Sequence, residues 1–191
     1  VKMTGYSRDI AASRAEAKRL LKEAGQENLS FKLTNRNVAM PYTPVGVYII
    51  DQWRQIGVNV QHEQLETRLY VAAQQKESGA YDAALDFNCD FLDEPNLQLQ
   101  KYISADKSPI NYAHQIDRKL DELYDRQSGE LDKNKRYALL REFEQYAFEK
   151  AYTVPIIWYH RLVVLHKQVK GWHISPNHYV GQDLADVWLA Q

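Results

Sequence analysis

The chain has 191 residues, with 24 Lys and Arg against 25 Asp and Glu, and its formal net charge is -1. This near-zero balance supplies no basic field for a phosphate backbone, which argues against nucleic acid as the main partner. Hydrophobic residues make up 45% of the chain and its apolar runs are short, so we expect a globular fold without a bilayer-spanning segment.

A helix is predicted near the start of the chain. Ser13 and Glu16 have the spacing of a capping box, in which each side chain satisfies a free backbone donor at a helix start. The following residues predict a helix over 15–24, and Gly25 supplies the left-handed conformation that ends it.

A strand–helix–strand unit is predicted over 31–62. Short strands beginning near Phe31 and Val58 flank a helix in which Thr43 is the N-cap and Pro44 the first helical residue. Apolar residues then recur at helical spacing, which predicts one buried face. Because parallel strands joined in this way cross over right-handedly, the unit predicts the start of a parallel sheet.

The rest of the chain continues with a helix, a strand, three helices and a final antiparallel pair of strands. Their predicted ranges are 67–77, 81–87, 95–103, 115–128, 132–150, 154–158 and 162–166. Asp132 is the expected N-cap of the last helix. This order predicts an α/β fold with a mixed central sheet and helices on both faces.

The common catalytic signatures are missing from the sequence. Its eight glycines form neither a dinucleotide-binding nor a phosphate-binding motif, and there is no GxSxG or HExxH motif. Cys89 is the only cysteine, which excludes an internal disulfide and a cysteine-based zinc site, and we expect an inert thiol. The six histidines are scattered. We therefore predict no catalytic residue, no metal site and no cofactor.

The most concentrated chemical feature is the acidic segment DFNCDFLDEP at 86–95. Its start has calcium-loop spacing, but Phe91 replaces the glycine of the sharp turn and Leu97 replaces the bidentate carboxylate. Three interpretations remain: a general acid–base pair, a solvated turn with helix caps, or a site for a cationic or amino-bearing ligand. Its position at the end of a buried strand favours the third.

Five segments occur in an order that is typical of one protein family. They are SRAEAKRLLKEAG, YIIDQWRQIGVNV, YDAALDFNCDFLDEP, IDRKLDELYDRQSGELDKNKRYALLREFEQYAFEKAYTVPI and LVVLHKQVKGW. Together they resemble the C-terminal lobe of the periplasmic solute-binding proteins of peptide, dipeptide and nickel ABC importers. The resemblance implies a periplasmic-binding-protein-like lobe over 1–170, with 171–191 returning toward a missing N-terminal lobe, and closure of both lobes around a ligand.

The resemblance also implies ligand contacts. In peptide-binding members, the first Asp of an Asp-Tyr-x-Asp-Pro element binds the ligand's α-amino group, and Asp90 is the matching position. The preceding strand end offers backbone groups to an extended peptide. The residues at those places are Asp86, Phe87, Asn88 and Cys89. Here the element carries one extra residue before Pro95.

Two further stretches are candidates for the ligand cleft. Arg36 follows a strand end, where open α/β sheets usually place ligand loops, and its guanidinium suits a carboxylate; a solvated loop arginine is the alternative. Asn111 and Tyr112 lie in a turn whose amide and phenol could reach a ligand; a loop that leads into a helix is the alternative.

We expect a non-enzymatic receptor fragment that captures a peptide or similar small solute and delivers it to an ABC permease of the inner membrane. The resemblance implies a periplasmic protein. The chain opens on VKMTGYSRDI, with neither a starting methionine nor an apolar signal core, so we expect a segment of a longer polypeptide with its signal peptide upstream. Two alternatives stay open: a carboxylate- or metal-dependent hydrolase, and a sensor or chemoreceptor docking module.

Overall fold

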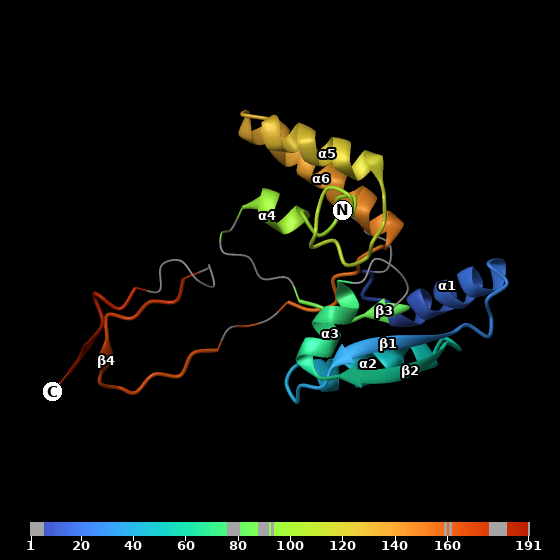
Figure 1. The fold of residues 1–191 in the computed structure, drawn as a ribbon, viewed down its shortest axis with the longest axis horizontal. Helices are drawn as coiled ribbons and strands as arrows, with labels where there is room; N and C mark the ends of the chain where they lie inside the picture. The colour runs from blue at the N-terminus through green and yellow to red at the C-terminus, as the bar shows by residue number, and fades with distance from the viewer. Residues whose placement is uncertain are drawn as a thin grey trace. The chain divides into compact units, whose positions relative to one another are not determined.

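The computed structural model describes residues 6–75, 81–87, 92, 94–158, 160, 162–175 and 183–190. The chain divides into two compact units, Val1–Phe87 and Asn88–Gln191 (Figure 1). Each unit has a hydrophobic core of its own. None of the helices in the described part of the chain is long and apolar enough to cross a lipid bilayer.

The first unit is built on a small parallel sheet. Its elements are α1 (Ile10–Glu23), β1 (Ser30–Arg36), α2 (Tyr42–Arg54), β2 (Asn59–Leu65), α3 (Thr67–Gln74) and β3 (Ala83–Ala84). The strand order is β2-β1-β3, and both neighbours run parallel to β1. The predicted strand–helix–strand unit is therefore confirmed, and β1 is the central strand.

The start of α1 differs from the prediction. The helix begins at Ile10, and the Asp9 side chain caps it by accepting a hydrogen bond from the Ala12 backbone N–H at 2.9 Å. The predicted capping box is wrong, because the Ser13 hydroxyl instead donates to the Asp9 carbonyl oxygen from inside the helix. The predicted end is confirmed: Gly25 has φ of 65° and follows the helix cap.

The start of α2 also differs from the prediction. Pro41 is the N-cap, without a side-chain capping bond, and Tyr42 is the first helical residue. Thr43 is therefore not the cap; its Oγ1 accepts a hydrogen bond from Gln64 Nε2 at 2.7 Å and ties α2 to β2. Burial of the Tyr42 ring in the core accounts for the earlier start, because it draws the first turn onto the sheet.

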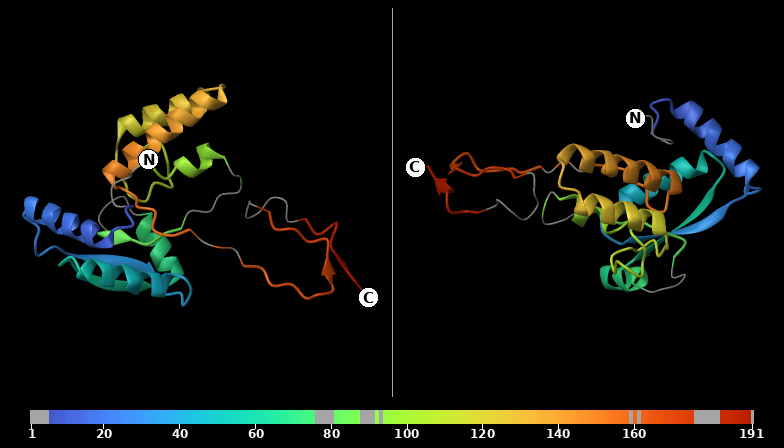
Figure 2. Two further views of the ribbon diagram at one scale, coloured as in Figure 1. Left: turned by 180° about the vertical axis from the view of Figure 1, so that it is seen from behind. Right: turned by 90° about the horizontal axis from the view of Figure 1, so that it is seen from above.

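The second unit is dominated by two long helices. Its elements are α4 (Pro95–Leu99), α5 (Arg118–Gly129), α6 (Lys133–Lys150), β4 (Val169–Lys170) and β5 (Trp188–Leu189). Helices α5 and α6 lie side by side (Figure 2) and enclose a core that includes Leu123 and Phe143. The Asp132 cap of α6 is confirmed, whereas α5 begins later than predicted because Asp117 caps it.

The predicted antiparallel pair over 154–166 is wrong for the residues that the structure describes, since none of them is in a strand. Trp158, Leu162 and Val164 are 93%, 88% and 96% exposed. The apolar pattern is typical of strands, but a strand needs a neighbour to satisfy its backbone groups. The antiparallel pairing that the structure does show joins β4 and β5, with Val169 opposite Leu189.

The α/β fold class is confirmed. The three strands of the first unit form a parallel sheet that is packed against helices, and the helices of the second unit enclose a core of their own. The predicted division of the chain near residue 170 stays a prediction.

Candidate functional site

The predicted ligand-binding residues are divided between the two units. Asn88, Cys89 and Asp90 lie outside the described residues, so the amino-group anchor Asp90 stays a prediction. Of the remaining candidates, those in the first unit are Arg36, Asp86 and Phe87, and those in the second are Asn111 and Tyr112.

Aromatic rings surround the guanidinium of Arg36, the last residue of β1. Its Cζ lies 5.1 Å from the ring centroid of Tyr42, 5.6 Å from that of Tyr70 and 5.6 Å from that of Phe87. Nη1 donates a hydrogen bond to the Tyr42 hydroxyl at 3.1 Å. We call these four residues the Arg36 cage. The structure thus brings together two predicted residues, Arg36 and Phe87, at the carboxyl end of the parallel strands.

The Arg36 guanidinium lacks a charged partner among the described residues. Its Nε is buried and makes no hydrogen bond, and no ion pair in the described part of the chain includes it. Aromatic faces attract a cation but leave its charge and its N–H donors unneutralised. An anion that approached the guanidinium would supply both, and a carboxylate would do so bidentately.

Tyr70 forms a rigid wall of the cage. It is fully buried, and its hydroxyl donates to the Leu85 carbonyl oxygen while accepting from Gln74 Nε2 at 3.0 Å. Burial, and then the negative charge of Asp86, raise the pKa of the Tyr70 phenol. The phenol therefore stays protonated and keeps its donor for the Leu85 carbonyl oxygen.

Asn35 holds two residues of the Arg36 cage in place through hydrogen bonds to their backbone groups. Its Nδ2 donates to the Tyr42 carbonyl oxygen at 2.7 Å and lies 3.1 Å from His62 Nε2, and its Oδ1 accepts from the Arg36 backbone N–H at 2.8 Å. Burial lowers the pKa of His62, so the neutral ring can accept the Asn35 hydrogen bond. Gly46 leaves the room for this contact, since a Cβ there would lie 2.5 Å from Asn35 Nδ2.

The other predicted residues of the first unit lie at the edge of the cage. Phe87 is half exposed, and its ring meets that of Tyr42 edge to face, with centroids 6.5 Å apart. Asp86 is exposed and acts on the cage through its charge, as the pKa of Tyr70 shows.

Asn111 and Tyr112 have surroundings of a different kind. Asn111 is buried, and its Nδ2 donates to the carbonyl oxygens of Ile103 and Gln115, at 2.7 and 3.2 Å. Its Oδ1 accepts from the backbone N–H groups of Ala113 and His114. Both the Nδ2 and the Oδ1 of Asn111 therefore have protein partners. This favours a structural role for Asn111 in a loop that leads into a helix over contact with a ligand. Tyr112 has Lys101 Nζ over its ring, 5.9 Å from the centroid.

Sequence reasoning missed Tyr42 and Tyr70, and it assigned Asn35 no role of its own. Tyr42 and Tyr70 look like ordinary members of apolar helix faces, and only the fold shows that their rings meet at Arg36. Asn35 carried a usable signal, because a polar residue inside a buried central strand requires a hydrogen-bonding partner. No three His, Cys, Asp or Glu side chains within the described residues gather closely enough to hold a metal ion.

No protein-family model and no curated protein matches the sequence. The structure is similar to OppA from Burkholderia pseudomallei, with a TM-score of 0.78 and 24% identity over 97% of this chain and 36% of that chain. The periplasmic binding protein DppA from Helicobacter pylori, in complex with the peptide STSA, gives a TM-score of 0.74 with 22% identity over 93% and 34%. The substrate-binding domain of an oligopeptide ABC transporter from Bacillus anthracis gives 0.65 with 22% identity over 78% and 29%.

The chain spans between 29% and 36% of the length of these proteins. The likeness extends over most of the present chain and agrees with the lobe that the sequence resemblance implies. The chain therefore has the fold of a lobe of the ABC transporter substrate-binding proteins.

Proposed function

We propose that the chain is part of a peptide-type ABC transporter substrate-binding protein and that its Arg36 cage binds the carboxylate of the solute. The observation that carries this proposal is the guanidinium at the carboxyl end of β1, whose buried Nε makes no hydrogen bond and which forms no ion pair with any described residue. The fold supports it, because open α/β sheets bind ligands outside the carboxyl ends of their strands. The role is capture and release, not catalysis.

The cage is suited to bind an anion that is shielded from water. The three rings hold the guanidinium in one orientation, so little side-chain entropy is lost when a carboxylate arrives. The missing part of the protein completes the pocket, and its closure excludes water and strengthens the ion pair. We further propose that the protein works in the periplasm, with a signal peptide upstream, and delivers its solute to an inner-membrane permease.

A peptide ligand whose carboxylate binds Arg36 also carries an α-amino group, and this positive group requires a negatively charged residue of the protein. Strand β3 is the neighbour of β1, so Leu85, Asp86 and Phe87, which follow β3, leave the sheet at the same edge as Arg36. Asp90 follows β3 in sequence and is our proposed anchor for the α-amino group, with Asp86, Asn88 and Cys89 beside it.

The exposed apolar residues of 154–165 fit the same proposal. Side chains such as Trp158 and Val164 are almost fully exposed, whereas side chains of this kind are normally buried. We propose that they pack against the other lobe of the longer protein, and that 171–191 returns toward that lobe. The chain alone would then bind solute weakly.

The test is calorimetric titration of the full-length protein with a panel of di- to pentapeptides. Arg36→Met keeps an unbranched side chain in the cage but removes the charge, and we expect it to weaken peptide binding at least about thirtyfold, or about 2 kcal/mol. Arg54→Met is the control, because Arg54 is exposed on α2 and forms only a long ion pair of 3.9 Å with Asp51. Equal affinities for both variants would refute the role of the cage.

A further inference from the structure

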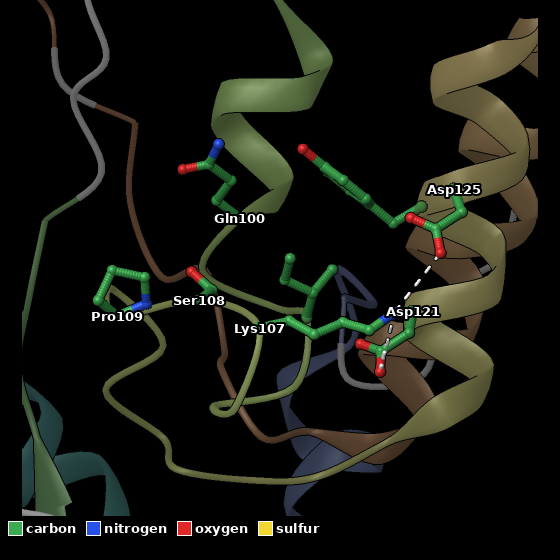
Figure 3. A pocket seen from close by; sticks show the side chains of 8 residues that line it. Gln100, Lys107, Ser108, Pro109, Asp121 and Asp125 are labelled. Atoms are coloured by element: carbon green, nitrogen blue, oxygen red, sulfur yellow. Dashed lines mark hydrogen bonds and ion pairs between the residues drawn. The ribbon is translucent and has the colours of Figure 1, made fainter.

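Two clusters of polar side chains lie outside the contacts that hold the solute in the proposed function. One lines a pocket between α5 and the loop after α4, where Lys107 Nζ lies 3.5 Å from Asp125 Oδ2 and 3.7 Å from Asp121 Oδ2 (Figure 3). These charged side chains pair with one another, so they offer a ligand no free charge. The other cluster is the contact between His62 of β2 and Asn35, which connects a titratable side chain to the Arg36 cage.

The hydrogen bonds of Asn35 determine which nitrogen of the His62 ring carries the proton. Asn35 Nδ2 donates to the Tyr42 carbonyl oxygen, and Oδ1 accepts from the Arg36 backbone N–H, so the amide cannot be reversed without losing both bonds. The second Nδ2 hydrogen is left for His62 Nε2, 3.1 Å away, and Nε2 must accept it. The neutral ring therefore carries its proton on Nδ1.

Protonation of the ring would place a hydrogen on Nε2 and set two donors against each other. Asn35 is fully buried, so an N–H that loses its acceptor there is costly. The ring is packed closely against α2, because a Cβ at Gly46 would lie 2.7 Å from Nε2. Burial lowers the pKa of His62, which keeps the ring neutral near pH 7 and allows protonation only in more acidic solution.

The charged side chains of the elements around His62 have other positions or partners. His62 pairs with Leu33 in the sheet, so it lies on the face opposite to Lys32 and Glu63, whose ion pair measures 3.0 Å. On α2, Asp51 and Arg54 are exposed and 3.9 Å apart. The other ionisable residues of β1, α2 and α3 are three cage members and two exposed residues, namely Arg36, Tyr42 and Tyr70, and Tyr48 and Arg68. Burial, and not one of these charges, is the cause of the lowered pKa of His62.

We propose that His62 is a positioning residue of the Arg36 cage and that its protonation releases the bound carboxylate. This inference rests on the proposed function of the cage. Asn35 is bonded to the backbone of Tyr42 and Arg36, and Tyr42 in turn holds the guanidinium through its hydroxyl and its ring. When protonation breaks the Asn35 contacts, the guanidinium loses the fixed orientation that favours carboxylate binding. Solute affinity should therefore fall in acidic solution, with uptake of a proton on release.

The test is calorimetric titration of the full-length protein at about pH 7 and about pH 5, with the tightest-binding peptide of the panel that has no ionisable side chain. The α-amino and α-carboxyl groups of such a peptide stay charged at both values. We expect the affinity of the parent to fall about tenfold in acid. His62→Gln offers Asn35 an acceptor that does not titrate, so it should bind like the parent at neutral pH and keep that affinity in acid. His62→Leu offers no acceptor and should bind about tenfold more weakly at both values.

His166→Gln is the matched control, because His166 is exposed and lies outside the cage; this variant should show the same pH dependence as the parent. Circular dichroism reports whether each variant is folded, and His62→Gln alone carries the test if His62→Leu is not. A folded His62→Gln variant that loses as much affinity in acid as the parent overturns the inference. Arg36→Met reports separately on the proposed function: equal binding by that variant and the parent at neutral pH refutes the role of the cage itself.

Discussion

Gly46 of α2 is the position where a single added methyl group should disturb the Arg36 cage. In Gly46→Ala the new Cβ would lie 2.5 Å from Asn35 Nδ2 and 2.7 Å from His62 Nε2, short of the 3.4 Å at which ordinary contact begins. The Asn35 side chain cannot move away without loss, because it is fully buried and hydrogen-bonded to the backbone of Tyr42 and of Arg36. The methyl group must therefore push α2 away from β1 or break the Asn35 hydrogen bonds.

The expected magnitude follows from opposing contributions. Overpacking of a filled interior costs about 1–3 kcal/mol, and a displaced Asn35 amide that is left unpaired costs about 1–3 kcal/mol. Alanine is favoured over glycine inside a helix by about 1 kcal/mol, which offsets part of this loss. We expect Gly46→Ala to lower the free energy of unfolding by about 2 kcal/mol.

Urea denaturation, followed by far-ultraviolet circular dichroism, measures this change. Gly129→Ala is the matched control, because Gly129 also lies in a helix but has no atom within 4 Å of an added Cβ. That variant should be as stable as the parent or more stable by up to about 1 kcal/mol. If Gly46→Ala is as stable as Gly129→Ala, the account of the contact between Gly46, Asn35 and His62 is wrong.

Four further predictions concern stability. Ser108→Ala should raise the free energy of unfolding by about 1 kcal/mol, because it removes an unpaired buried hydroxyl. Ser104→Ala loses the hydroxyl that accepts from the Asp117 N–H at 2.9 Å and should lower the free energy of unfolding by a similar amount. If urea denaturation shows Ser104→Ala to be more stable than Ser108→Ala, both predictions are contradicted. Burial lowers the pKa of His62, so the unfolded chain binds its proton more readily and stability should fall as the pH drops below 6.5. If the free energy of unfolding falls with pH equally in the parent and in His62→Gln, protonation of His62 is not the cause of the loss of stability. Asp117→Ala removes the N-cap of α5 and the partner of the Tyr146 hydroxyl, so it should lower the free energy of unfolding by about 1–2 kcal/mol. Thermal unfolding measures this loss, with Asp125→Ala as the control.

Local patterns predicted the framework of both units well. The helical spacing of apolar residues located α2, α5 and α6, and the parallel pairing of β1 with β2 followed from the connection through a single helix. Helix caps were less predictable, because several residues near a helix start can accept the same backbone N–H. At α1 the sequence predicted Ser13 as the cap, and the structure shows that Asp9 caps the helix.

The candidate site was predictable only in part. Arg36 was found because it ends a strand, which is a property of the local sequence. Tyr42 follows Arg36 closely in the chain, but Tyr70 belongs to a helix much later in the sequence, so the approach of Tyr70 to the guanidinium has no local signal. The same reason explains the wrong prediction for 154–166. A strand-like composition favours an extended backbone, but the backbone forms a sheet only if a neighbouring strand elsewhere in the protein pairs with it.

The most direct test of the central claim combines a change in the ligand with a change in the cage. The full-length protein and its Arg36→Met variant are each titrated with one peptide in two forms, with a free carboxyl terminus and with an amidated one. If Arg36 binds the carboxylate, amidation weakens binding at least about tenfold in the parent and has little further effect in the variant. Equal losses on amidation in both proteins would show that the carboxylate binds elsewhere, and would contradict the role assigned to the Arg36 cage.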